Sequence, residues 1–220
     1  MGKRTYEQSL TFFNTRYTDD RGLGRELYKT PIPIIKQIVE SIIVKYPELY
    51  NKIWVDPCAG DGRWSKVINS YGIKTKSFDI EPLSEDVIKQ DFYEYKGEDN
   101  IFIIGNPPFS ELKKFIEHSL SICSECYFLG GSGIITGGLS NKVKLLHRFV
   151  GYEGNQKDKR SKVKFIDSND KDVIVWCCGA IFDNLEHNKF ERTDTFEENT
   201  FRVAVKKYCK EDNRIVKLEK

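Results

Sequence analysis

Short apolar runs alternate with helical patterns between residues 53 and 129, and this order restricts the fold more than any other feature of the sequence. Strands are predicted at 53–55, 74–78, 87–88, 101–104 and 127–129, with helices at 64–71 and 112–122. Strands that alternate with helices are typical of a mostly parallel sheet with helices on both faces. We therefore expect an α/β fold.

The flanks of this region add further elements. Thr30-Pro31 begins a helical pattern that Pro47 ends, because proline is favoured in the first turn of a helix and disfavoured in its interior. The runs at 163–166 and 173–182 predict a final hairpin. The 220 residues suit one domain, which we divide into an N-terminal arm at 1–29, the domain body and a charged tail at 206–220.

The charge is informative through its distribution and not its sum. The net charge of +2 comes from 35 basic and 33 acidic residues, so it neither favours nor excludes a polyanionic partner. A basic stretch at 137–162 is predicted to be a loop. Its candidate contacts to a nucleic-acid backbone are Lys157, Lys159, Arg160 and Lys162. The alternative is that these side chains are solvated surface charges.

The six cysteines and the start of the chain indicate a reducing compartment. The first residues lack the apolar region of a secretory signal, and no apolar run is long enough to cross a membrane. We therefore expect free thiols and a cytoplasmic location. Cys123-x-x-Cys126 could form half of a zinc site, but a second pair is not evident, so we expect structural thiols and no metal.

Polar residues follow the first three predicted strands. The first strand runs into Asp56-Pro57-Cys58-Ala59-Gly60-Asp61-Gly62, where glycines let a ligand approach the backbone closely. The glycine spacing is not the dinucleotide fingerprint. Asp79 ends the second strand, where a carboxylate can accept hydrogen bonds from ribose hydroxyls. Asp91-Phe92 follows the third strand and could contact an adenine ring.

The fourth strand, 101–104, ends at Asn106-Pro107-Pro108-Phe109. This motif places an amide side chain and a rigid backbone carbonyl at the sheet edge, because consecutive prolines restrict the backbone. An aromatic ring lies just beyond. The set suits the binding of a planar group that carries an exocyclic NH2.

In this combination the sequence resembles the S-adenosylmethionine-dependent amino methyltransferases. The resemblance is to DNA adenine-N6 methyltransferases with an Asn-Pro-Pro-Phe motif, and to small enzymes encoded by phages and other mobile elements. It implies a Rossmann-like, seven-stranded, mostly parallel sheet with one antiparallel strand and helices on both faces. It also implies S-adenosylmethionine as cofactor and, for a viral protein, a location inside the host cell.

The resemblance assigns roles to individual residues. The catalytic residues would be Asn106 and Pro107, whose oxygens accept from the target amine, and Phe109, which stacks on the target ring. Asp56 would hold the cofactor ammonium, and Thr30-Pro31 would close over its methionine end. The complete cofactor set is Thr30, Pro31, Asp56, Cys58, Gly60, Gly62, Asp79, Ile80, Asp91, Phe92 and Asn106.

The motif does not select one substrate. We expect methylation of adenine N6 in DNA, with adenine in RNA as the main alternative. Protein glutamine is less expected, because those enzymes usually carry a longer helical domain before the glycine motif. A catalytically silent subunit that binds nucleic acid is the non-enzyme alternative. The chain has no room for a separate target-recognition domain, so specificity is loose, or 137–162 reads the target, or a partner subunit or second copy does.

Overall fold

The computed structural model describes residues 28–131, 139–150, 161, 163–167 and 170–196. Its helices are α2 (Ile32–Lys45), α3 (Arg63–Ser70) and α4 (Leu112–Ile122), with 3₁₀-helices at Pro47–Asn51, Phe92–Glu94 and Ser140–Lys142. Its strands are β1 (Ile53–Asp56), β2 (Thr75–Asp79), β3 (Ile88–Lys89), β4 (Ile101–Gly105), β5 (Glu125–Gly131), β6 (Val143–Val150), β7 (Val163–Ile166), β8 (Asp172–Val175), β9 (Cys177–Asp183) and β10 (Glu191–Phe196).

The main sheet is mostly parallel, as predicted. Its eight described strands have the order β10-β6-β9-β5-β4-β1-β2-β3. Strand β9 runs antiparallel to both of its neighbours, and the remaining described pairs are parallel. The α/β class and the antiparallel strand are therefore confirmed, whereas the described residues form eight strands of this sheet and not the seven expected.

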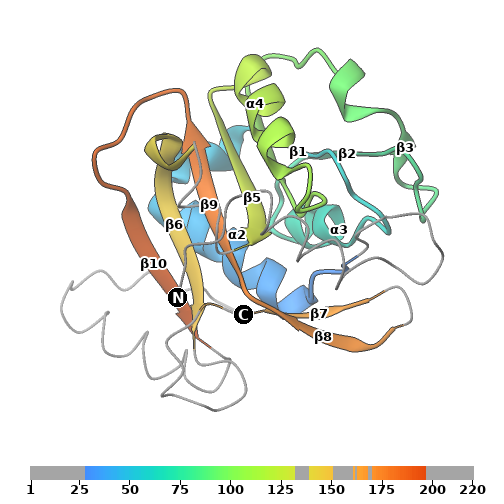
Figure 1. Ribbon diagram of the computed structural model, residues 1–220. Helices are drawn as coiled ribbons and strands as arrows, with labels where there is room; N and C mark the ends of the chain where they lie inside the picture. The colour runs from blue at the N-terminus through green and yellow to red at the C-terminus, as the bar shows by residue number, and fades with distance from the viewer. Residues whose placement is uncertain (1–27, 132–138, 151–160, 162, 168–169, 197–220) are drawn as a thin grey trace.

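Helices cover both faces of this sheet (Figure 1). Side chains alternate between the faces along each strand, so Trp54 and Phe102 pack into a cluster with α2 and α3, while Val55 and Ile103 pack into a cluster with α4. The isoleucines of α2 that recur at helical spacing are buried, which confirms that predicted helix. In the described part of the chain, no helix has the length and apolar character needed to span a bilayer.

Part of the predicted basic loop at 137–162 is a strand. Residues Val143–Val150 form β6 inside the main sheet, paired with β9 and β10. Its apolar side chains are interrupted by Lys144, His147 and Arg148, and a register irregularity follows Val143, so the sequence shows no regular alternation. The four predicted substrate-binding residues, Lys157, Lys159, Arg160 and Lys162, lie outside the described residues.

The predicted final hairpin is divided between two sheets. Strands β7 and β8 form a separate two-stranded sheet, and the chain continues through Trp176 into β9 of the main sheet. Figure 1 shows this β7–β8 hairpin apart from the main sheet. On its inner face Phe165 is fully buried, while Ile174 on the opposite face is 37% exposed.

Candidate active site

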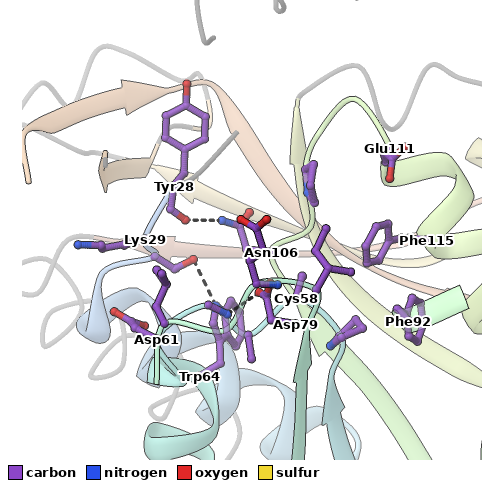
Figure 2. A pocket seen from close by; sticks show the side chains of 18 of the residues that line it. Tyr28, Lys29, Cys58, Asp61, Trp64, Asp79, Phe92, Asn106, Glu111 and Phe115 are labelled. Atoms are coloured by element: carbon purple, nitrogen blue, oxygen red, sulfur yellow. Dashed lines mark hydrogen bonds between the residues drawn. The ribbon is translucent and has the colours of Figure 1, made fainter. Parts of the chain in front are cut away.

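A cavity of about 480 Å³ lies at the carboxyl ends of β1, β2 and β4 (Figure 2). Parallel strands that end together place their following loops side by side, which is where ligands bind in open α/β sheets. The predicted site residues that line it are Thr30, Cys58, Gly60, Asp79, Ile80, Asp91, Phe92 and Asn106. Those outside its lining are Pro31, Asp56, Gly62, Pro107 and Phe109.

Asp79 connects the glycine turn to the end of β2. Its Oδ2 accepts from the backbone N–H of Gly60 at 2.8 Å, and its Oδ1 accepts from that of Glu81 at 2.9 Å. Gly60 has a φ of 53° and Gly62 a φ of 74°, so both positions need the left-handed backbone that glycine permits. A carboxylate oxygen can accept more than one hydrogen bond, so these two bonds are compatible with ribose hydroxyls as further donors.

The cavity lining is acidic. Its carboxylates outnumber its cations. The carboxylates are Asp61, Asp79, Glu81, Asp91 and Glu111, and the cations are Lys29 and Arg63. A pyrophosphate would be repelled by this lining, and the Gly60 N–H that could bind it is already used by Asp79. A nucleoside with a cationic centre fits the same charges.

Thr30 closes one side of the cavity. Its side chain is buried, and its Oγ1 accepts from the Trp64 indole N–H at 3.3 Å. The Thr30 carbonyl accepts from the Arg63 guanidinium at 3.0 Å, and that guanidinium is paired with Asp61 at 2.6 Å. Thr30 is thereby joined to Arg63 and Trp64, just after the glycine turn, and Pro31 directly precedes α2. The closure of Thr30-Pro31 over a cofactor stays a prediction. Arg63 was not predicted, because an arginine at a helix start has no distinctive pattern.

Asp56 lies beneath the turn. It is 1% exposed, its Oδ1 accepts from the Cys58 N–H at 3.3 Å, and its Oδ2 has no hydrogen-bond partner among the described residues. Burial raises the pKa of Asp56 to about 8, with Asp79 and Asp61 adding to the rise and the Cys58 N–H opposing it. Burial and the neighbouring Asp56 also raise the pKa of the Cys58 thiol, which favours its protonated form.

One wall of the cavity is aromatic. Phe92 is buried and stacks on Phe115, with ring centroids 5.3 Å apart and planes inclined by 21°. Asp91 caps the short helix that begins at Phe92, since its Oδ1 accepts from the Tyr93 N–H at 2.9 Å. Such a wall beside carboxylate acceptors suits a purine ring. Phe115 lies in the helix predicted at 112–122, and its place in the cavity lining has no separate sequence signal.

Asn106 lies between Tyr28 and this wall (Figure 2). Its Nδ2 donates to the backbone carbonyl of Tyr28 at 2.9 Å. Its Oδ1 is buried and has no hydrogen-bond partner among the residues that the structure describes. A buried acceptor without a partner is costly, so this oxygen is suited to an N–H donor from a ligand.

The other two predicted catalytic residues are placed differently. Pro107 is buried directly after Asn106. The Phe109 ring packs edge to face on Phe165 of β7, with centroids 6.5 Å apart. The stacking of Phe109 on a target ring stays a prediction.

No family model and no curated protein matches the sequence, whereas solved structures do. A candidate RNA methyltransferase from Pyrococcus horikoshii is 14% identical, with a TM-score of 0.56, over 83% of this chain and 100% of its own. A candidate class I S-adenosylmethionine-dependent methyltransferase from Listeria monocytogenes is 10% identical, with a TM-score of 0.52, over 94% of this chain and 78% of its own. The methyltransferase subunit of a type I restriction-modification system from Streptococcus thermophilus is also 10% identical, with a TM-score of 0.53, over 94% of this chain and 57% of its own.

The chain has the class I methyltransferase fold. At these identities the likeness establishes the fold alone. The residues of the cavity must therefore carry any argument about activity.

Proposed function

We propose that this protein transfers a methyl group from S-adenosylmethionine to the N6 amine of adenine in DNA. The observation that carries the proposal is Asn106, which lines the same cavity as Asp79 and whose buried Oδ1 has no hydrogen-bond partner among the described residues. The class I fold, the acidic lining and the aromatic wall support S-adenosylmethionine as the cofactor. Bound there, S-adenosylmethionine would supply an electrophilic methyl group on a cationic sulfur.

The protein's own contribution is to make the amine a better nucleophile. The lone pair of an exocyclic amine is delocalised into the ring, so the nitrogen is poorly nucleophilic. Asn106 Oδ1 and the Pro107 carbonyl would accept hydrogen bonds from the two N–H groups of the target amine. These bonds favour a pyramidal nitrogen and stabilise the positive charge that develops there. This is electrostatic preorganisation with proximity, and it requires no strong base.

A target adenine has to leave the base stack before Asn106 can reach it. Inside a duplex the N6 amine is paired, so the substrate is either single-stranded or flipped out. The predicted clamp of Lys157, Lys159, Arg160 and Lys162 would hold the phosphate backbone in either case. A partner subunit or a second copy would extend this clamp.

Adenine in RNA is the second candidate. It is favoured by the match to the candidate RNA methyltransferase, which this chain covers along its full length. The restriction-modification subunit has the same fold, but the chain covers 57% of it. Both candidates use the same amine and the same acceptors, so they differ only in the nucleic acid that delivers the base.

The test is to incubate the protein with methyl-labelled S-adenosylmethionine and mixed DNA and RNA, and to digest the products to nucleosides. Label in N6-methyldeoxyadenosine supports the proposal, and label in N6-methyladenosine supports the RNA candidate. Label found only on protein would favour glutamine instead. Absence of S-adenosylmethionine binding would contradict every enzyme assignment and leave a silent nucleic-acid-binding subunit.

A further inference from the structure

The orientation of the Asn106 amide depends on one backbone oxygen. An asparagine side chain can place either its oxygen or its nitrogen toward a given neighbour. The Tyr28 carbonyl can only accept, so it pairs with Nδ2 at 2.9 Å and leaves Oδ1 as the free end of the amide (Figure 2). A displaced Tyr28 carbonyl would remove the preference between the two orientations.

The β7–β8 hairpin holds this carbonyl in place. The residue after Tyr28 pairs with β7 as an isolated bridge: Lys29 N–H donates to Ile166 O at 2.8 Å, and Ile166 N–H donates to Lys29 O at 3.1 Å. The Lys29 ammonium also pairs with Asp170 at 2.7 Å. The Lys29 N–H belongs to the same peptide unit as the Tyr28 carbonyl, so the bridge holds that unit, and the bonds of Thr30 to Arg63 and Trp64 anchor the chain just beyond it.

A single side chain of the hairpin contacts both segments that meet at the Asn106 amide. Phe165 is fully buried, with its ring centroid 6.0 Å from that of Tyr28 and 6.5 Å from that of Phe109. Tyr28 supplies the carbonyl, and Phe109 belongs to the segment that follows Asn106. Phe165 therefore packs against both sides of the Asn106–Tyr28 hydrogen bond without lining the cavity.

We propose that the β7–β8 hairpin positions the catalytic amide, with Phe165 and the backbone of Ile166 fixing the Tyr28 carbonyl so that Asn106 Oδ1 faces the substrate amine. This role rests on the proposed methyl transfer to an amine. It makes the hairpin part of the active site although none of the hairpin residues that the structure describes lines the cofactor cavity. Its effect is expected on the rate of transfer and not on cofactor binding.

The variant Ile166→Pro isolates this connection. Proline lacks the N–H that donates to Lys29, while the ladder between β7 and β8 is preserved because that N–H points away from β8. Ile166→Val keeps the N–H and is the matched control. Phe165→Leu is the second variant, since it retains apolar volume but loses the ring contacts to Tyr28 and Phe109.

We expect Ile166→Pro to lower kcat by about tenfold or more, because small misplacements of reacting groups are costly. Its dissociation constant for S-adenosylmethionine should be close to that of Ile166→Val. Phe165→Leu should act in the same direction. In NMR spectra, the side-chain amide protons of Asn106, assigned by their loss in Asn106→Ala, should shift in Ile166→Pro and stay in place in Ile166→Val.

Two results would overturn the positioning role. The first is that kcat and the Asn106 amide signals both stay unchanged in the folded variants. The second is that kcat and cofactor affinity fall equally. The second would mean that the hairpin only closes the cofactor cavity. If the wild-type protein methylates no acceptor, the proposed function fails. The Asn106 amide signals then decide the positioning role by themselves.

Discussion

At the scale of single residues, the proposal depends most on Asn106. Asn106→Ala removes the buried Oδ1 acceptor, so we expect kcat for methyl transfer to fall roughly 100-fold, as for other lost transition-state hydrogen bonds. The dissociation constant for S-adenosylmethionine, measured by calorimetry, should change little. Asp79→Ala is the matched comparison, because it removes the partner of Gly60 and should weaken cofactor binding. Equal losses of rate and affinity in Asn106→Ala would contradict the acceptor role.

Asp56 predicts a pH dependence of stability without ligand. Its pKa is raised from 3.8 to about 8 by burial, so the folded protein holds a proton that the unfolded chain has released across this interval. The contribution of Asp56 to stability is therefore lost as pH rises from about 4 to about 8, by roughly 1 kcal/mol per pH unit. Asp56→Asn removes this dependence. The free energy of unfolding of the variant, relative to that of wild type, should therefore rise with pH. A constant difference between pH 5 and pH 8 in urea unfolding would contradict it.

At the scale of elements, β9 must contain glycine at one position. A Cβ on Gly179 would lie 1.8 Å from Tyr127 Oη, and Tyr127 is fully buried in the neighbouring β5. The same hydroxyl lies 3.3 Å from Nδ1 of the buried His147 in β6. Gly179→Ala should therefore cost about 3 kcal/mol in urea unfolding, because it overpacks the junction of three strands. Tyr127→Phe, which only removes the hydroxyl, should cost about 1 kcal/mol. If Gly179→Ala lowered the free energy of unfolding no more than Tyr127→Phe does, the strands would be able to move apart and accommodate the extra methyl group.

Most of the elements predicted from sequence are buried along an apolar run or an apolar helix face. Strand β4 and helix α2 were recognised because their core residues are contiguous or helically spaced. Strand β6 was missed because charged residues interrupt it, and β10 because Glu191 and Arg192 begin a strand with few apolar residues. Pairing with β9 and β6 in three dimensions, and not local pattern, makes these segments strands.

At the scale of the whole molecule, the sequence predicted which strand ends meet at the cavity better than it predicted the surroundings of the Asn106 amide. Asp79 and Asn106 were found because each ends a strand of one parallel sheet, which brings them to a shared edge. The contact of Asn106 with Tyr28 could not be predicted, because a backbone carbonyl has no residue signature. The same holds for the hairpin, whose bridge to Lys29 joins segments distant in sequence.

The molecule's net charge of +2 makes nucleic-acid binding depend on where the cations lie. Glutamate substitutions at Lys157, Lys159, Arg160 and Lys162 should weaken binding and flatten its salt dependence, by about 0.9 in the slope of log K against log[salt] for each lost phosphate contact on duplex DNA. The control with equal charge change reverses four exposed lysines elsewhere, namely Lys36, Lys74, Lys89 and Lys113. Titrations of labelled DNA at several salt concentrations measure both slopes. The same slope in both variants would mean that the predicted clamp is solvated surface, and that a partner subunit or other residues hold the nucleic acid.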